Sequence, residues 1–484
     1  MITFKKLFSQ SAAGVLLLLV CGGCYHVWKP LPAGLNHHGQ PFPSETIQFL
    51  TDVTYVDSAG ERRLEQDIFD SLFAMIDQAE KLILVDMFLF NEFTGESGPP
   101  HRRLCEELTA ALIARKTAVP SLRIIVITDP VNTVYGGLEA SHLTRLETAG
   151  VDVVMTDLDR LRDSNPLWSS PWRLLVKPFG DAKGKGTVKS PFGEEKVSRR
   201  SWLKMINFKA NHRKVAVMDS GAGLSAWVSS ANPHDGSSAH GNVALVFDGP
   251  AAMDILKTEE AVLAYTSPET PLPSQRLGLL PGSAPAAEDT LRIQVLTEGA
   301  IGRAADQMID TAKPGDTLDM VMFYVADRSI VSRLKQAAER GVAMRIILDP
   351  NKDAFGRTKK GLPNRQTGGE LVKAGIPVRW ADTHGEQSHA KLLMINHADG
   401  TSDMLLGSAN LTRRNLRNYN LETNVLFSGP TESCPATAAN RYVARLWNND
   451  DGKSFTTDFD TYRDDSIWKK IRCHIQEKTG LCTW

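Results

Sequence analysis

Two short stretches of the chain repeat one another: NHRKVAVMD at residues 211–219 and SHAKLLMIN at residues 388–396. Each places a histidine two residues before a lysine, and an apolar run follows. Each also leads to a turn of small residues that ends in asparagine, at Asn232 and at Asn410. A single match to so short a motif would carry little weight, but the duplication indicates two half-sites.

The segments around the two stretches also repeat, in the same order along the chain. The matching pairs are 81–90 with 316–324, 122–130 with 344–350, 149–155 with 374–380, and 242–250 with 422–430. So many ordered matches make coincidence improbable. A chain of 484 residues also exceeds the size at which one hydrophobic core usually stops growing, so we predict two similar domains.

The repeated segments alternate between two kinds of pattern. Residues 122–128 and 344–348 are short apolar runs rich in isoleucine and valine, typical of strands buried on both faces. Amphipathic helical stretches, such as 102–115 and 328–340, lie between such runs. This alternation predicts an α/β sandwich in each half, with a mainly parallel or mixed sheet covered by helices.

The domain boundaries follow from the repeat and from a proline-rich segment. We predict a signal peptide at 1–23, a first domain at 24–266, a linker at 267–290 and a second domain at 291–484. The first domain carries an insertion at about 158–205, which mixes aromatic residues with many lysines and arginines. Such a mixture suits a lipid headgroup interface, but it could also bind single-stranded nucleic acid or form an ordinary covering loop.

The spacing of histidine and lysine has a geometric meaning. On an extended strand, residues two apart point to the same side, so His212 and Lys214 can reach one phosphate, as can His389 and Lys391. For either copy alone, a surface strand with a solvated histidine and lysine is the simpler interpretation. Because the motif is duplicated, we expect both copies to converge on one pocket. Such a pocket could attack a phosphodiester without a metal.

The duplicated stretches resemble the phospholipase D superfamily, whose hallmark is a repeated His-x-Lys-x4-Asp motif followed by Gly-Ser-x-Asn. The resemblance covers most of the chain after about residue 45. It implies that His212 is the nucleophile and His389 the general acid. It also implies that Lys214, Lys391, Asn232 and Asn410 hold the phosphate oxygens.

The resemblance also assigns orienting residues. Glu422 matches the carboxylate that orients the second histidine, and the corresponding position of the first half is Asn242, an amide. Asp219 keeps the aspartate of the motif, whereas Asn396 replaces it in the second copy. At the end of a strand, this residue is expected to support local structure more than chemistry.

The beginning of the chain resembles an export signal, with Lys5 and Lys6 before a short apolar run. Small residues before Cys24 resemble a bacterial lipobox, which would make Cys24 a lipidated N-terminus. A plain cleaved signal or an uncleaved anchor are the alternatives. In an exported protein Cys473 and Cys482 are the pair expected to form a disulfide, with buried thiols as the other interpretation.

These features together predict a phospholipase D or a cardiolipin-synthase-like phosphatidyltransferase at the cell envelope. Its expected partners are phospholipids and a membrane surface that faces the periplasm, and it would act as a monomer without cofactor or metal. The alternatives are an exported nuclease, which the net charge of −1 disfavours, and a catalytically silent scaffold that binds lipid.

Overall fold

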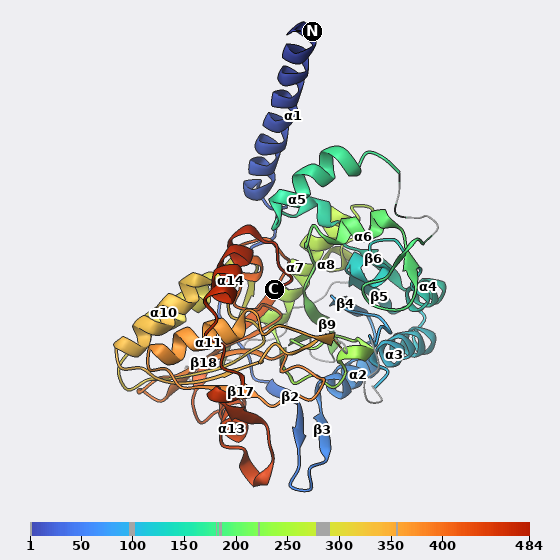
Figure 1. Cartoon of the computed structure of the whole chain (residues 1–484). Coiled ribbons are helices and arrows are strands. Elements are labelled where there is room, and N and C mark those ends of the chain that lie inside the picture. Colours follow the sequence, from blue (N-terminus) through green and yellow to red (C-terminus); the bar gives the residue numbers. More distant parts are fainter. Residues whose placement is uncertain are drawn as a thin grey trace.

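In the computed structural model the chain forms two α/β domains, and helix α1 (Ile2–Trp28) projects from one end of the molecule (Figure 1). The structure describes residues 2–95, 102–180, 182, 186–220, 223–276, 291–354 and 357–484. Within these residues, no helix combines the length and the apolar character needed to cross a bilayer.

The first sheet is mixed, with the strand order β3-β2-β11-β10-β9-β4-β5-β6. Strands β4, β5 and β6 pair in parallel, and the remaining neighbours are antiparallel. In sheet order the strands are β3 (Arg62–Gln66), β2 (Ile47–Val56), β11 (Asn242–Asp248), β10 (Gly223–Ser229), β9 (Lys214–Ser220), β4 (Leu82–Met87), β5 (Arg123–Thr128) and β6 (Asp152–Met155).

The second sheet repeats this arrangement in the order β1-β12-β20-β19-β18-β13-β14-β17-β21. Strands β13, β14 and β17 form its parallel part. In sheet order the strands are β1 (Phe42–Pro43), β12 (Arg292–Thr297), β20 (Thr423–Pro430), β19 (Thr401–Gly407), β18 (Lys391–Asn396), β13 (Thr317–Met322), β14 (Ala343–Leu348), β17 (Val378–Ala381) and β21 (Thr456–Asp458). The motif strands β9 and β18 take equivalent places, each antiparallel to the first parallel strand of its sheet.

Helices cover the outer face of each sheet, and the inner faces share a core. The outer helices are α2 (Ile68–Gln78), α3 (Leu104–Ala118) and α4 (Ser141–Thr148) in the first half, and α9 (Gly299–Thr311), α10 (Arg328–Glu339) and α11 (Asn364–Lys373) in the second. Helix α7 (Pro250–Thr266) contacts both β10 and β12, and α13 (Cys434–Asn448) contacts both β2 and β13. One hydrophobic cluster therefore joins the halves, with Val215 and Leu392 from the two motif strands among its members.

The predicted α/β fold with mixed, helix-covered sheets is confirmed. The domain boundaries stay a prediction, and residues 277–290 of the predicted linker lie outside the described residues. The preceding residues include the short helix α8 (Pro273–Arg276), which contacts α7. Phe42 and Pro43 lie in the predicted first domain but pair with β12 of the second sheet.

The predicted insertion contains regular structure among its described residues. It forms α5 (Pro166–Pro171), a π-helical turn (Trp172–Val176), a hairpin of β7 (Val188–Lys189) and β8 (Lys196–Val197), and α6 (Arg199–Met205). Helix α5 packs against α1, where the Ser170 hydroxyl donates to the carbonyl of Leu19 at 2.9 Å. Further elements of the second half are β15 (Asp353–Ala354), β16 (Arg357–Thr358), α12 (Arg413–Leu416) and α14 (Ile467–Thr479).

Candidate active site

Both motif histidines line one pocket of about 470 Å³ at the junction of the halves. Asn410 lines it as well, and most of the remaining wall is apolar or aromatic. Phe88 and Phe93 come from the first half, Phe192 and Met205 from the insertion, and Phe323, Tyr324 and Trp484 from the second half. The two half-sites therefore meet, as the repeat predicted.

Two backbone links across the junction bring the histidines together. The N–H of His212 donates to the carbonyl of Leu421 at 2.9 Å, and the N–H of His389 donates to the carbonyl of Gly241 at 2.7 Å. In each case the preceding residue, Asn211 or Ser388, forms a parallel β-bridge with the same partner residue. Each histidine is therefore held by the half of the chain that carries the other one.

The same links decide which side chain orients each ring. His212 Nδ1 lies 3.0 Å from Oε2 of Glu422, which also accepts from the Ser408 hydroxyl at 2.5 Å and is fully buried. Asn415 donates to the other carboxylate oxygen. Because an ionised carboxylate only accepts hydrogen bonds, Nδ1 of His212 carries the hydrogen, and Nε2 is the nitrogen that can act on a substrate.

His389 has the equivalent environment with a neutral partner. Its Nδ1 lies 3.0 Å from the carbonyl oxygen of Ser230 and 3.2 Å from the side-chain oxygen of Asn242. The Ser230 hydroxyl donates to that amide oxygen at 2.9 Å, as Ser408 does to Glu422. Both neighbours of Nδ1 are acceptors, so this nitrogen also carries hydrogen.

The prediction that Glu422 orients the second histidine is therefore wrong. Glu422 contacts His212, and Asn242 contacts His389. The reason is the crossed backbone links, which place residue 422 beside 212 and residue 242 beside 389. Each half supplies the orienting group for the histidine of the other.

The motif lysines lie behind the histidines and are buried. The ammonium of Lys214 donates to the carbonyl of His212 at 2.7 Å, and that of Lys391 donates to the carbonyl of His389 at 2.5 Å. Neither lysine is among the described residues that line the pocket. Their ammonium groups therefore lie beneath the histidines, where a positive charge favours an anion in the pocket.

An aromatic ring covers each histidine and lysine pair, which we did not predict. The Phe88 ring lies 4.7 Å from the ring of His212 and 4.9 Å from the Lys214 ammonium. Phe323 lies 4.7 Å from the ring of His389 and 5.1 Å from the Lys391 ammonium. The repeat contained a signal, because a Met-Phe pair recurs near the end of the matching segments, at residues 87–88 and 322–323. These rings exclude water from the cations while their faces attract positive charge.

Burial suppresses positive charge throughout this site. Burial lowers the pKa of His212 to about 4, although Glu422 opposes the shift. Burial lowers the pKa of Lys214 to about 7, and it lowers the pKa values of His389 and Lys391 well below their ordinary ranges. The charges of Lys214 and Lys391 add to the effect on His389. An anionic phosphate would supply the missing negative charge and raise these pKa values.

Like the two lysines, Glu422 and Asn242, the predicted phosphate-binding residues Asn232 and Asp219 do not line the pocket in the described part of the chain. The side-chain oxygen of Asn232 accepts from the N–H of Leu89 at 3.3 Å. Asp219 lies at the far end of β9, where its carboxylate accepts the N–H groups of Lys81 at 2.8 Å and Leu82 at 2.7 Å. A role of Asp219 in orienting the phosphate is therefore wrong, and the expectation of a local structural role is right. At the equivalent position, Asn396 donates to the side chain of Asn440 at 2.8 Å.

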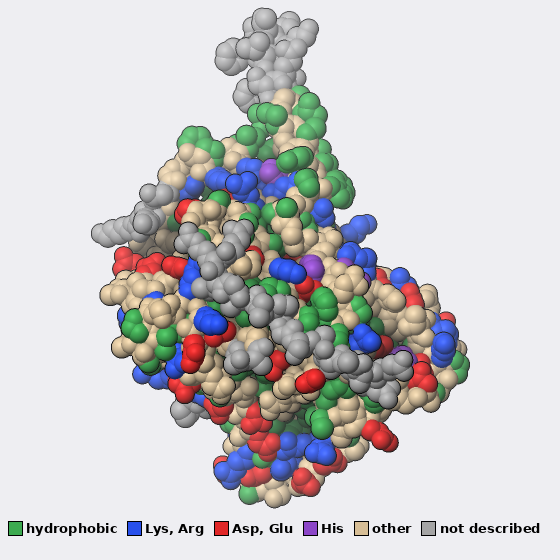
Figure 2. All heavy atoms as spheres, turned by 180° about the vertical axis from the view of Figure 1, so that it is seen from behind, with side chains coloured by type: hydrophobic (Ala, Val, Ile, Leu, Met, Phe, Trp, Pro, Cys, Tyr) green, Lys and Arg blue, Asp and Glu red, His purple; other side chains and the backbone are tan. Residues whose placement is uncertain are grey.

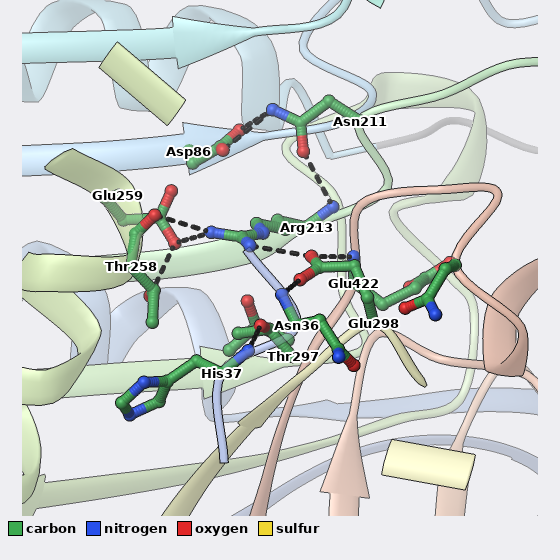
Figure 3. Close-up of polar contacts among 12 residues, drawn as sticks. Asn36, His37, Asp86, Asn211, Arg213, Thr258, Glu259, Thr297, Glu298 and Glu422 are labelled. Atoms are coloured by element: carbon green, nitrogen blue, oxygen red, sulfur yellow. Dashed lines mark hydrogen bonds and ion pairs between the residues drawn. The ribbon is translucent and has the colours of Figure 1, made fainter. Parts of the chain in front are cut away.

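A buried arginine between histidine and lysine ties the halves together (Figure 3). The Arg213 guanidinium contacts Glu259 of α7 at 2.8 Å and Glu298 of the second half at 2.7 Å. The Glu298 carboxylate also accepts the backbone N–H of Glu422 at 3.2 Å. We did not predict this network, although a charged residue on the same side of a buried strand as Val215 is a signal for a buried ion pair.

The structure contradicts the predicted disulfide and does not test the predicted lipidation of a cysteine. Cys473 and Cys482 are both free and buried, so the expected disulfide is not formed. Burial raises the pKa of Cys473 to about 12, which keeps this thiol protonated. Cys24 is exposed on α1, and its lipidation stays a prediction.

One family model and several solved structures are similar to this chain. The family model described as "Cardiolipin synthase, PLD-like domain" matches residues 306–447. The crystal structure of phosphatidylserine synthase from Haemophilus influenzae Rd KW20 is 13% identical, with a TM-score of 0.56 over 92% of this chain and 96% of that chain.

Two further solved structures are less similar. Polyphosphate kinase from Porphyromonas gingivalis is 14% identical, with a TM-score of 0.44 over 91% of this chain and 54% of that chain. The phospholipase D family member Nuc from Salmonella typhimurium is 22% identical, with a TM-score of 0.27 over 36% of this chain and 99% of that chain. No curated protein sequence matches the chain. The family match confirms the predicted resemblance to the phospholipase D superfamily.

Proposed function

We propose that this chain, which contains a phospholipase D-like domain at residues 306–447, is a phospholipid phosphodiesterase or phosphatidyltransferase that uses a phosphohistidine intermediate. One observation carries the proposal: His212 and His389 line the same pocket, and each has its Nδ1 fixed by a group from the opposite half. When two oriented imidazoles line the same pocket, one can act as the nucleophile and the other as the general acid.

In the first step, Nε2 of neutral His212 attacks phosphorus. A P–N bond forms, the P–O bond to the leaving group breaks, and His389 donates its Nε2 proton to the departing oxygen. In the second step, water or an alcohol attacks phosphorus and loses its proton to His389. The P–N bond then breaks and returns the free enzyme with a hydrolysed or transferred product.

The different partners of the two histidines support this division of roles. A phosphorylated imidazole is positively charged, and the buried carboxylate of Glu422 compensates that charge on His212. His389 faces the neutral Asn242, so its protonated form lacks such support and gives up the proton readily. Lys214 and Lys391 supply positive charge beneath the phosphate, and Asn410 offers an amide to its oxygens. We propose that these groups make a divalent cation unnecessary.

The lining of the pocket favours a phospholipid over a polynucleotide. Its wall is mostly apolar, and the insertion contributes Phe192 and Met205. The cationic side chains of the wall already have partners within the protein. Lys209 pairs with Asp163 at 2.8 Å, and Arg414 donates to the carbonyl of Cys482 at 2.6 Å. A polynucleotide requires a track of cations that are available to successive phosphates, whereas an acyl chain requires apolar walls.

The membrane location is part of the proposal. We propose that residues 1–23 direct export and that Cys24 becomes the lipidated N-terminus of a protein that faces the periplasm. The exposed position of Cys24 beside the insertion supports this. Mass spectrometry of the N-terminal peptide from cells tests it, because a diacylated Cys24 and an unprocessed Met1 differ in mass.

The test of the activity uses purified protein with chelator, incubated separately with labelled phosphatidylglycerol and with single-stranded DNA. We expect release or transfer of the lipid headgroup, and no cleavage of DNA. Cleavage of DNA alone would make the chain a nuclease. Cleavage of neither substrate would favour the silent lipid-binding scaffold.

Substitution of the histidines tests the mechanism. His212→Ala should abolish turnover, and His389→Ala should slow turnover and leave phosphate on His212, which mass spectrometry can detect. His397→Ala is the matched control, because His397 contacts Asp316 and Asp403 at the far end of β18. If His212→Ala were as active as His397→Ala, the proposed mechanism would be refuted.

A further inference from the structure

The large apolar side chains that are exposed in the described residues gather on three segments. All of them except Leu64 and Val372 belong to α1, to the insertion with α6, or to α14 and the residue after Gly480. Scattered exposed apolar residues are normal, but a concentration of this kind marks an interaction surface. Residues 1–23 are the proposed export signal, so we call the exposed apolar side chains of the remaining part of α1, of the insertion with α6, of α14 and of Leu481 the apolar end of the molecule.

Helix α14 contributes a ridge of its own to the apolar end. Ile467, Ile471 and Ile475 follow one another at four-residue intervals, and Trp468 lies beside them with 81% of its surface exposed. The opposite side of the helix is buried through Cys473 and Glu477. A helix that already packs against the protein with one face therefore presents a second apolar face outward.

Exposed basic side chains border this ridge. Arg472 and Lys478 are exposed on α14. Lys470 of α14 and Lys177 of the insertion are also exposed, and they pair with Glu370 at 3.2 Å and with Asp159 at 2.7 Å. Figure 2 shows basic side chains gathered around the base of α1, below the apolar side chains of that helix. A helix with isoleucine and tryptophan on one face and lysine and arginine along its borders suits the boundary between acyl chains and anionic headgroups.

The three segments are in contact and form one end of the molecule (Figure 1). The carbonyl of His26 in α1 accepts from the N–H of Asp163 in the insertion at 2.9 Å. Gly480, at the end of α14, packs so closely on the insertion that an added Cβ would lie 1.8 Å from the carbonyl oxygen of Ser164. The three segments that carry the apolar end are therefore joined through the insertion.

The apolar end also borders the pocket. Helix α6 carries the exposed Trp202 and ends at Met205, which lines the pocket. The chain after α14 continues directly into Thr483 and Trp484, which line it as well. A bilayer against α6 and α14 would therefore place its lipids within a few residues of the pocket wall.

We propose that α14 and the adjoining insertion form a membrane-docking surface for anionic phospholipid bilayers, which presents the pocket to lipids that remain in the membrane. The inference rests on the proposed function, because it assigns that site a substrate delivered from a bilayer. It goes beyond the predicted role of the insertion, because α14 belongs to the second half and carries the ridge.

The first test measures hydrogen exchange of the full chain with and without vesicles of phosphatidylglycerol. Amides of residues 467–479 should exchange more slowly with these vesicles and less so with vesicles of phosphatidylcholine. Unchanged exchange in α14 would overturn the proposal. Exchange does not depend on catalysis, so this result stands even if the chain cleaves no lipid and the proposed function fails.

The second test compares the triple variant Ile467→Ser, Trp468→Ser, Ile471→Ser with the control Leu64→Ser. Leu64 is an exposed apolar residue on β3, at the opposite end of the molecule (Figure 1). The triple variant should cleave lipid in vesicles about tenfold more slowly and monomeric short-chain lipid at the normal rate. An equal loss on both substrates, or self-association of the wild-type chain that the triple variant abolishes, would overturn the proposal.

Discussion

Glu422→Gln tests the asymmetry between the two half-sites with a change of very few atoms. The glutamine keeps the size of the side chain but removes its charge, so both histidines would then face an amide. In the wild-type protein the carboxylate is fully buried and lies 3.0 Å from Nδ1 of His212. The variant therefore copies the environment that Asn242 already gives His389.

The expected loss follows from the strength of a charged hydrogen bond. A bond to a charged group contributes about 1.5–3 kcal/mol and a neutral one about 0.5–1.5 kcal/mol, so the charge is worth about 1–2 kcal/mol. If positive charge develops on His212 during attack, the turnover rate should fall about five- to thirtyfold. Steady-state kinetics at pH 7 measures this, with circular dichroism to establish that the variant is folded.

The pH dependence gives a second, independent readout. Burial lowers the pKa of His212 to about 4, and Glu422 raises it against that effect. Without the carboxylate the pKa should fall further, so neutral His212 persists to lower pH. The acidic limb of the rate profile should therefore move to lower pH while the plateau drops. An unchanged plateau, or an acidic limb that moves to higher pH, would refute the assignment of His212 as the nucleophile that Glu422 supports.

Three further predictions concern the charges of the site and its surroundings. Because burial lowers the pKa of Lys214 to about 7, an anion such as tungstate should bind with proton uptake at pH 8, and its affinity should fall as the pH rises. Calorimetry in buffers of different ionisation enthalpy measures the proton uptake. Binding without proton uptake would contradict this prediction. Arg213→Ala leaves Glu259 and Glu298 buried without their cation, so urea denaturation should show an unfolding free energy lower by about 3–5 kcal/mol, and a loss below about 1 kcal/mol would contradict the role of the network. Asp219→Ala removes the acceptor for backbone N–H groups at the start of β4 and should cost about 1–3 kcal/mol in the same assay. The folded Asp219→Ala protein should keep its specific activity. A loss of activity without a loss of stability would show that Asp219 has a role in the active site.

Much of the fold could be predicted because the repeat marks equivalent strands. The apolar runs at 122–128 and 344–348 predicted strands that are buried on both faces, and they form β5 and β14 in equivalent places. The alternation of His212 and Lys214 predicted that both side chains share a face of a strand. These features are local, since they depend on the period of side chains along one segment.

The partners of the histidines could not be predicted in the same way. Aligning the two copies assigns each orienting group to its own half, whereas contact across a twofold relation assigns it to the other. The burial of Lys214 beneath Phe88 also depends on the packing of two strands that are far apart in the sequence. The structure of the insertion could not be predicted because its aromatic and basic residues have no clear period.

The crossed backbone links have a consequence for how such a site can originate. A single domain of this kind would carry one histidine and one orienting group that do not contact each other. Only a twofold dimer of such domains could bring a histidine and an orienting group together in each half-site. Two identical subunits must offer the same group to both rings. Glutamate at position 422 and asparagine at position 242 are possible together only because one continuous polypeptide encodes both places, and covalent fusion is therefore what permits the two imidazoles to specialise.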